Sequence, residues 1–167
     1  MDEPRALTAD ERPMLTTDER QIWKKLAILM FQVPAAVETQ LQQNAGMSHF
    51  EYAALHLLAQ APGHKLQVSA LADAARASRP RVSQGMTRLE RRGWVRRQPS
   101  PHDSRATLIV LTDAGRAQLA EATPGYHETV RALVLSGLDN TDVQHLEAVC
   151  DLLLSNLETY QAVTGPA

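Results

Sequence analysis

Residues 66–112 constrain the fold of this chain most, because two short helical patterns meet there at a turn and a β-hairpin pattern follows them. The tip of the predicted hairpin is the segment PSPHDSR, residues 99–105. This region also concentrates positive charge: two acids, Glu90 and Asp103, stand against nine arginines, at positions 76, 79, 81, 88, 91, 92, 96, 97 and 105. The local balance is +7 in a chain whose net charge is −2. Cations gathered on one such unit predict a surface that binds a phosphate backbone.

Length and composition favour one intracellular domain. At 167 residues and 44% hydrophobic content, the chain is long enough for a single core. No apolar run reaches 18 residues, and the acidic N-terminus lacks the features of a secretory signal, so we expect a cytoplasmic protein without membrane contact. The single cysteine, Cys150, excludes an intrachain disulfide and a CxxC metal site. Aromatic residues make up only 4%, which disfavours stacking on single-stranded nucleic acid.

The first 45 residues predict an arm followed by a long helix. Residues 1–15 are polar and without period, and we expect a flexible arm there. A helix is predicted from Thr17, with a kink at Pro34 and an apolar stripe at Ile22, Leu26, Leu29, Val33 and Ala36. Trp23, Met30 and Val37 form an adjoining stripe. So wide an apolar face predicts burial against a second chain.

Three shorter helices follow. A capping box over residues 48–51 predicts a helix to about Gln60, which Pro62 and Gly63 close. Ser69 is predicted to cap a helix over 70–76, and Ser78 to cap another that ends at Gly93. In that last helix the wheel places Val82, Met86 and Leu89 on a buried face, opposite Gln84, Thr87, Arg88 and Arg91.

The remainder predicts a hairpin and two helices. Residues 94–98 and 105–111 have β-type character and pair naturally around the tip. Thr112 is predicted to cap a fifth helix, which Pro124 and Gly125 bend or break before it resumes to about Leu135. A connector over 138–141 precedes the final helix. Its heptad seam predicts packing against another helix and consists of Val143, Leu146, Cys150, Leu153, Leu157 and Tyr160.

Four segments in this order resemble the MarR family of bacterial winged helix-turn-helix regulators: SALAD at 69–73, LERRGWV at 89–95, DSR at 103–105 and LTDAG at 111–115. The resemblance covers about residues 17–160. It implies a mainly helical fold with a small β-hairpin wing, in which helices from both termini form a dimerisation region. The domain is expected over 16–167, with dimerisation helices at 16–45 and 113–162 and the winged helix-turn-helix at 48–112. The interface residues are predicted to be Ile22, Leu26, Val143, Leu146, Cys150, Leu153 and Leu157.

The function implied is a homodimeric regulator, a repressor, that binds a pseudo-palindromic site in double-stranded DNA. Bases are expected to meet the N-terminal half of the arginine-rich helix, through Arg79, Arg81, Ser83 and Gln84. Arg88 and Arg91 touch phosphates or form internal ion pairs. In the wing, Asp103 can hold Arg105, which by resemblance enters the minor groove. The predicted DNA-binding set is Ser69, Ser78, Arg79, Arg81, Ser83, Gln84, Arg88, Asp103 and Arg105.

The resemblance also implies release by a small-molecule effector, often aromatic or anionic. The residues that could line its pocket are Trp23, Met30, Phe31, Met47, His49, Phe50 and His56, each of which is also ordinary core material. No metal or other cofactor is expected, since two histidines do not make a metal site.

Two other functions stay open from the sequence. The winged unit could dock an acidic protein instead of DNA, although its polar face lacks exposed aromatic residues. Cys150 could make the regulator redox-responsive, although a cysteine in a heptad seam usually behaves as a small hydrophobe. An enzyme is not expected, because the chain has no nucleophile–base arrangement, glycine-rich phosphate loop or HExxH motif.

Overall fold

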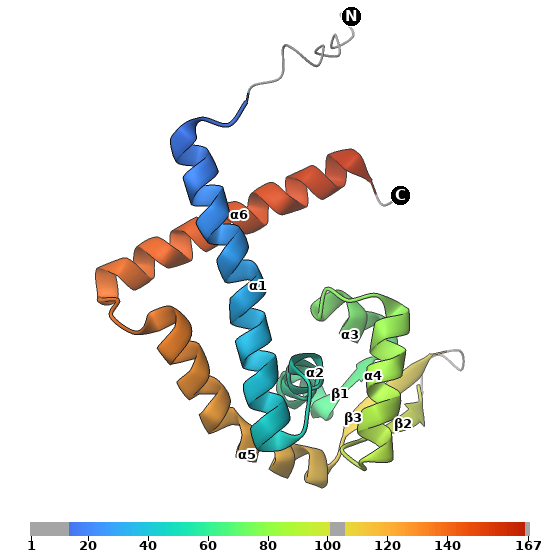
Figure 1. Cartoon of the computed structure of the whole chain (residues 1–167). Helices are drawn as coiled ribbons and strands as arrows, with labels where there is room; N and C mark the ends of the chain where they lie inside the picture. Colours follow the sequence, from blue (N-terminus) through green and yellow to red (C-terminus); the bar gives the residue numbers. More distant parts are fainter. Residues whose placement is uncertain (1–13, 101–105, 166–167) are drawn as a thin grey trace, which may run out of the picture.

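The computed structural model describes residues 14–100 and 106–165 and shows a mainly helical chain with one small antiparallel sheet (Figure 1). This confirms the predicted fold class. In chain order the elements are α1 (Thr17–Ala45), α2 (His49–Gln60), the short helix η1 (Pro62–His64), β1 (Lys65–Gln67), α3 (Val68–Ala74), α4 (Arg79–Arg91), β2 (Val95–Pro99), β3 (Thr107–Leu111), α5 (Asp113–Val130), the π-helical turn η2 (Arg131–Leu135) and α6 (Asn140–Thr164).

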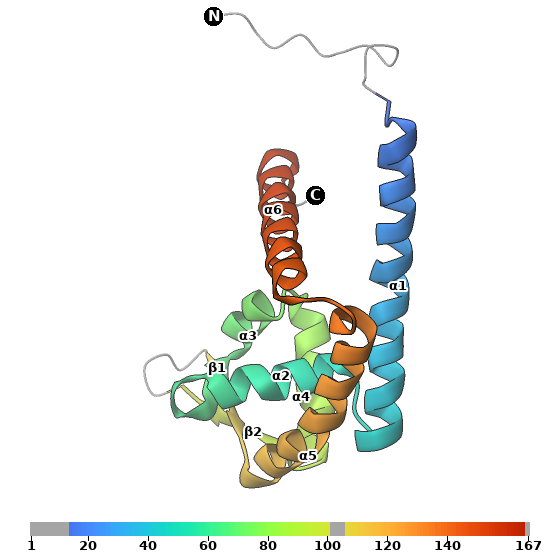
Figure 2. The same cartoon turned by 90° about the vertical axis from the view of Figure 1, so that its left-hand side faces the viewer.

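The elements separate into a compact unit and long helices that extend from it. Helices α2, α3 and α4 pack with the sheet at one end of the molecule, and α5 runs beside the end of α1 (Figures 1 and 2). Helix α6 crosses α1 in Figure 1 but stands apart from it when the molecule is turned by 90° in Figure 2. None of the helices within residues 14–100 and 106–165 combines the length and the apolar character needed to span a membrane.

Most helix starts lie where the capping residues predict them. Ser48 and Glu51 form a reciprocal capping box on α2, and the hydroxyls of Ser78 and Thr112 accept backbone N–H groups of α4 and α5. The predicted cap at Ser69 is wrong, because α3 begins at Val68 with Gln67 as its N-cap. Strand β1 leads directly into α3 and leaves no turn for Ser69 to cap.

The sheet has three strands in the order β1-β3-β2, one more than predicted. The predicted hairpin is present, with Val95 opposite Leu111 and Pro99 opposite Thr107. Its second strand, β3, lies in the centre, and its residues 108–111 are buried. Strand β1 pairs with the other edge of β3 over three residues, too few to show the alternation that reveals a strand. The wing tip, including Asp103 and Arg105, lies outside the described residues.

Two prolines lie inside helices that continue through them. Helix α1 runs past Pro34 to Ala45, and α5 runs past Pro124 to Val130. The alternative of a break at Pro124 and Gly125 is therefore wrong, although α5 changes direction part-way along its length in Figure 1. Proline removes one hydrogen bond of the helix, which a packed helix tolerates by bending.

The core lies in the compact unit. Leu41, Leu55, Leu71, Met86 and Ile109 are fully buried and come from α1, α2, α3, α4 and β3. Helix α1 contributes to this core only through its last turns. Its first half, and the whole of α6, carry exposed apolar side chains.

Candidate nucleic-acid interface

Helix α4 presents one polar face from a firmly packed base. Its predicted buried residues, Val82, Met86 and Leu89, are all fully buried. The helix begins at Arg79, where the Ser78 hydroxyl accepts the backbone N–H of Arg81 at 3.4 Å. The apolar face thus fixes which side chains point outward.

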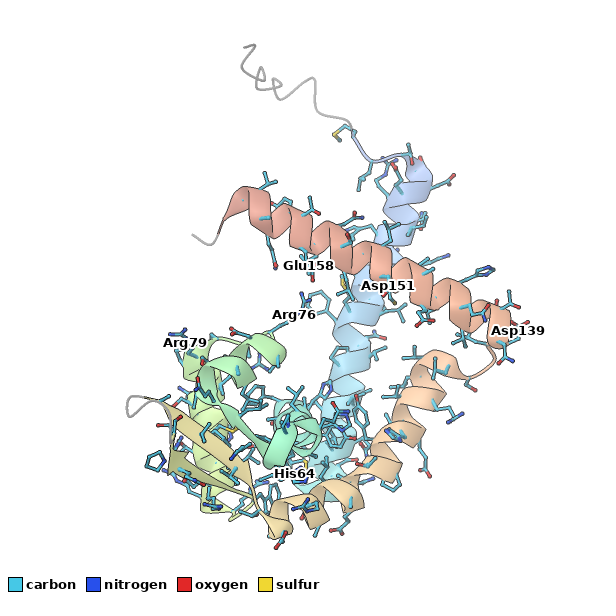
Figure 3. The ribbon with its side chains drawn as sticks, turned by 180° about the vertical axis from the view of Figure 1, so that it is seen from behind. His64, Arg76, Arg79, Asp139, Asp151 and Glu158 are labelled. Carbon is cyan, nitrogen blue, oxygen red and sulfur yellow. The ribbon has the colours of Figure 1, made fainter. Side chains whose placement is uncertain are left out.

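The four predicted base-contacting residues, Arg79, Arg81, Ser83 and Gln84, are all exposed on the N-terminal half of α4. Figure 3 shows Arg79 at the side of the molecule away from α5. The structure therefore brings these four side chains together on one accessible turn and a half of helix. Ser78 lies next to them as the cap, whereas Ser69 is partly buried within α3.

Arg88 has an internal partner. Its Nε donates to Glu51 Oε1 of α2 at 2.8 Å, and the Glu51 side chain is only 4% exposed. Burial acts to raise the pKa of Glu51, but hydrogen bonds from the Ser48 N–H and Arg88 outweigh it and hold that pKa below its usual value. Of the two roles that the sequence left open for Arg88, the structure supplies the internal ion pair, which joins α4 to α2.

Arg97 braces the wing against α4. Its guanidinium donates to Glu90 Oε2 at 2.7 Å and to Thr87 Oγ1 at 3.1 Å, while its backbone N–H donates to Glu90 Oε1 at 3.0 Å. Strand β2 is thereby tied to the helix that precedes it. This contact was not predicted, because the packing of a hairpin on a helix is not visible in the spacing of residues along the sequence.

Two further arginines join elements of the scaffold. Arg92 Nη1 donates to the Gly46 carbonyl at 2.6 Å, and its guanidinium lies 4.8 Å from the centre of the Trp94 ring. Arg76 forms an exposed pair with Glu158 of α6 at 2.8 Å, and Figure 3 shows these two side chains directed toward each other. Among the described arginines of α4 and β2, Arg79, Arg81, Arg91 and Arg96 are exposed and form no ion pair with another described residue.

The seven predicted effector residues do not form one pocket among the described residues. Trp23 and Phe31 are exposed on α1, and Met47 is fully buried in the core. Trp23 lies about 33 Å along α1 from its last residue, Ala45, at 1.5 Å per residue, so it cannot reach the start of α2 in the same chain.

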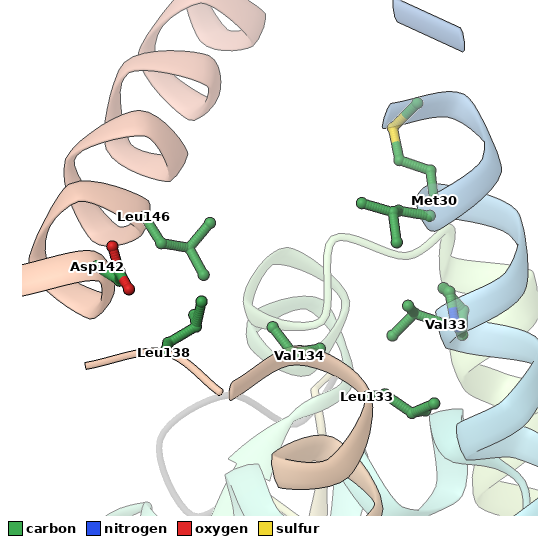
Figure 4. A pocket seen from close by; sticks show the side chains of 9 residues that line it. Met30, Val33, Leu133, Val134, Leu138, Asp142 and Leu146 are labelled. Atoms are coloured by element: carbon green, nitrogen blue, oxygen red, sulfur yellow. The ribbon is translucent and has the colours of Figure 1, made fainter. Parts of the chain in front are cut away.

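Met30 lines an apolar cavity of about 590 Å³ between α1 and the segment from η2 to α6 (Figure 4). The other residues that line it are Leu29, Val33, Pro34, Leu133, Val134, Leu138, Asp142 and Leu146. Leu146 belongs to the predicted dimer interface. The structure therefore places Met30 beside Leu146 of the predicted interface instead of beside the histidines.

His49 and His56 do lie together, in a second cavity of about 350 Å³ between α2, the end of α3 and α5. Its other aromatic residues, Tyr52, Tyr126 and His127, were not predicted from the sequence. The Tyr52 and Tyr126 rings stack with centres 4.2 Å apart, and burial together with Tyr52 raises the pKa of Tyr126. Tyr52 and His56 at i and i+4 on α2 were a signal for this cluster.

Across residues 14–100 and 106–165, no three histidine, cysteine or acidic side chains are grouped so as to hold a metal ion. Cys150 is a free, exposed thiol on α6.

A helix-turn-helix with a hairpin wing, carried on long helices, defines the class of winged helix-turn-helix proteins. A model of the MarR family matches residues 45–106. The chain is 32% identical to Sco3205, a MarR family transcriptional regulator from Streptomyces coelicolor solved in complex with DNA, with 87% of this chain and 92% of that one covered and a TM-score of 0.84. The chain belongs to the MarR family of transcriptional regulators.

Other relatives support the same family assignment. AbsC, a second MarR family regulator from Streptomyces coelicolor, is 26% identical over 89% of this chain and 99% of that one, with a TM-score of 0.83. The transcriptional repressor MprA of Escherichia coli strain K12 is 33% identical over 113 residues. That match spans 68% of this chain and 64% of the repressor. These relatives are transcriptional regulators and not enzymes.

Proposed function

We propose that this protein is a sequence-specific, homodimeric transcriptional repressor that binds a pseudo-palindromic operator and is released by a small-molecule effector. The observation that carries this proposal is the exposed N-terminal half of α4, which presents Arg79, Arg81, Ser83 and Gln84 from a helix fixed by a buried core. These side chains suit the major groove of DNA, where arginine pairs with guanine and glutamine with adenine.

The internal arginines support the same role. Arg88 joins α4 to α2, and Arg97 joins β2 to α4. These contacts hold the helix and the wing together as one unit for DNA binding. Arg91 and Arg96 remain exposed for phosphate contacts. Arg105 at the wing tip is proposed, by family resemblance, to enter the minor groove.

Assembly is supported by the surface that a single chain leaves uncovered. Along the predicted α6 seam, Val143, Leu153 and Leu157 are 39%, 43% and 45% exposed, and Ile22 on α1 is 65% exposed. So many exposed apolar side chains on two helices mark an interface. A two-fold dimer would present two α4 helices to the two halves of one operator.

The cavity between α2, α3 and α5 is the proposed effector site. Its imidazole and phenol groups suit a planar ligand that also forms hydrogen bonds. The cavity borders α3, the first helix of the helix-turn-helix, so a bound ligand would contact the DNA-binding unit directly. Release requires that the ligand bind the DNA-free dimer more tightly than the DNA-bound dimer.

The test titrates purified protein at several salt concentrations against a duplex from its own upstream region and a shuffled duplex of equal composition. We expect a preference of about a thousandfold, with affinity falling steeply as salt rises. Arg81→Ala should weaken specific binding by about tenfold to a hundredfold. Arg116→Ala removes an exposed arginine from α5 and should leave binding unchanged.

The other outcomes separate the alternatives. Equal, salt-sensitive binding to both duplexes contradicts sequence specificity for this operator. No binding to either duplex favours a protein-docking module. Binding that peroxide abolishes in the natural protein, but not in Cys150→Ser, favours redox control.

A further inference from the structure

Phe50 lies directly beneath the DNA-facing helix although it belongs to α2. It is the second residue of that helix, and its partly buried ring packs against the core. A Cβ atom added to Gly85 of α4 would overlap Cε1 of the Phe50 ring and lie 2.9 Å from Cδ1. The ring therefore occupies a notch in α4 that exists because residue 85 has no side chain.

The same ring supports the guanidinium of Arg81. The Arg81 Cζ lies 5.4 Å from the centre of the Phe50 ring, within the range of a cation–π contact. Arg81 and Gly85 are four residues apart and so share one side of α4. Both residues thus meet Phe50, and Phe50 and Arg81 line the same shallow cavity of about 210 Å³.

The first turn of α2 holds the ring in place. Ser48 and Glu51 close their capping box on either side of Phe50, and the backbone N–H of His49 donates to Glu38 Oε2 of α1 at 2.7 Å. Helices α1 and α4 therefore both fix this turn. Because its backbone is fixed, the Phe50 ring limits the orientations that the Arg81 guanidinium can take when it stacks on the ring.

We propose that Phe50 is a positioning residue for DNA recognition: its ring fixes the plane of the Arg81 guanidinium and thereby sets the base preference of Arg81. Arginine recognises guanine through two parallel N–H donors, so discrimination depends on the plane of the guanidinium. An unsupported arginine samples many rotamers and loses this geometry. The inference rests on the proposed function, since it requires that α4 contact bases.

The experiment selects preferred sequences from a randomised duplex library with the natural protein, Phe50→Leu, Phe50→Tyr and Arg81→Ala. We expect Phe50→Leu to reduce the preference at one position of each half-site by about tenfold, and that position to be the one that Arg81→Ala alters. Phe50→Tyr keeps the ring face and should retain the preference. Arg116→Ala is the control, because Arg116 is exposed on α5 and belongs to neither α2 nor α4.

Two more variants test whether Phe50 acts by positioning Arg81 or only by stabilising the fold. Phe50→Leu with Arg81→Ala should discriminate no worse than Arg81→Ala alone, because both changes remove one interaction. Gly85→Ala keeps the Phe50 side chain but displaces its ring, so it should relax the same base position even if Phe50→Leu folds poorly. A uniform loss at every position, or an unchanged preference in Phe50→Leu, overturns the proposal. Absence of any preference in the natural protein overturns the proposed function and this inference with it.

Discussion

Glu51 is a buried carboxylate that serves two purposes at once. One oxygen accepts the Ser48 N–H at 2.9 Å and closes the start of α2, while the other accepts Arg88 of α4 at 2.8 Å. Without its charge, the capping contact could persist, but the attraction to Arg88 would be lost. The position of α4 therefore depends on the ionisation of one side chain outside it.

We expect Glu51→Gln to lower the free energy of unfolding by about 1.5–3 kcal/mol near neutral pH, the usual range for a hydrogen bond to a charged group. Because the folded pKa of Glu51 is lowered, the stability that its charge adds is complete above the unfolded pKa and disappears as pH falls through the folded pKa. The difference between the two proteins should thus start to narrow as pH falls below about 4.3, the ordinary pKa of a glutamate, and should close once pH is below the lowered pKa of the folded state.

Urea unfolding at fixed protein concentration, measured from neutral to acidic pH, checks this expectation. Glu121→Gln, at an exposed position on α5, is the control and should change little. A difference between the natural protein and Glu51→Gln that stays constant down to pH 3 would contradict the assignment.

Side-chain roles were only partly predictable from the sequence. The buried face of α4 followed from helical periodicity, because Val82, Met86 and Leu89 share one side whatever surrounds the helix. Periodicity could not show which arginines are free at the surface and which bind other parts of the chain. Arg97 meets Glu90 only after the hairpin folds back on α4, and Arg92 meets Gly46 across 46 residues of chain. Contacts of this kind depend on tertiary packing that local spacing does not encode.

At the scale of elements, the junction between the wing and α5 brings two backbone segments into close contact. The Thr112 N–H donates to the Trp94 carbonyl at 3.1 Å, and the Thr112 hydroxyl accepts the N–H of Gly115 at 3.0 Å. Gly115 is buried in the first turn of α5. A Cβ at this residue would overlap the Trp94 carbonyl oxygen and lie 2.9 Å from the carbonyl carbon.

We expect Gly115→Ala to lower the free energy of unfolding by about 1–3 kcal/mol, because the backbone it meets cannot rotate away. Gly125→Ala, in the same helix, is a matched comparison. Its Cβ would lie 2.7 Å from Gln40 Nε2, the end of a flexible side chain, so the cost should be smaller. Thermal or urea unfolding measures both, and equal stability of Gly115→Ala and the natural protein would contradict the close approach.

Elements with their own local signals were the easiest to predict. The capping box of α2 and the Ser78 and Thr112 caps placed three helix starts correctly. Strand β1 escaped prediction because it is three residues long and is defined by its pairing with β3. Its presence also explains the error at Ser69, since the strand determines where α3 begins.

At the scale of the whole molecule, α6 is the element that a single chain leaves unsupported. Every described residue of α6 except Leu146 is exposed. Its ion pair with the compact unit joins Glu158 to Arg76, and both side chains are 60% exposed. An exposed pair contributes at most about 1 kcal/mol, so α6 needs another surface to hold it.

We expect Leu153→Glu to shift the protein from dimer toward monomer, weakening association by at least about tenfold, or 1.4 kcal/mol. A dimer would bring the introduced charge into an apolar interface, where its desolvation is costly. Sedimentation or light scattering gives the mass directly. Ser155→Glu places the same charge on the opposite face of α6 and should leave the mass unchanged. If Leu153→Glu remains a dimer, the prediction that the α6 seam forms the interface is wrong.

The proposed effector site was the least predictable feature at this scale. His49 and His56 were placed correctly on one face of α2, but the residues across the cavity, Tyr126 and His127, come from α5 some 70 residues later in the chain. Trp23 and Phe31 were grouped with them on residue type alone, and the length of α1 separates them. A pocket formed between distant elements has no signature in local sequence.

The position of Cys150 gives this protein a built-in chemical reporter. The thiol lies at a seam position of α6 and is exposed in a single chain. If two seams pair, that thiol becomes shielded, and only dissociated chains react promptly with a thiol reagent. The rate of colour release from such a reagent would then count free protomers continuously, in an unlabelled natural chain that contains no other cysteine.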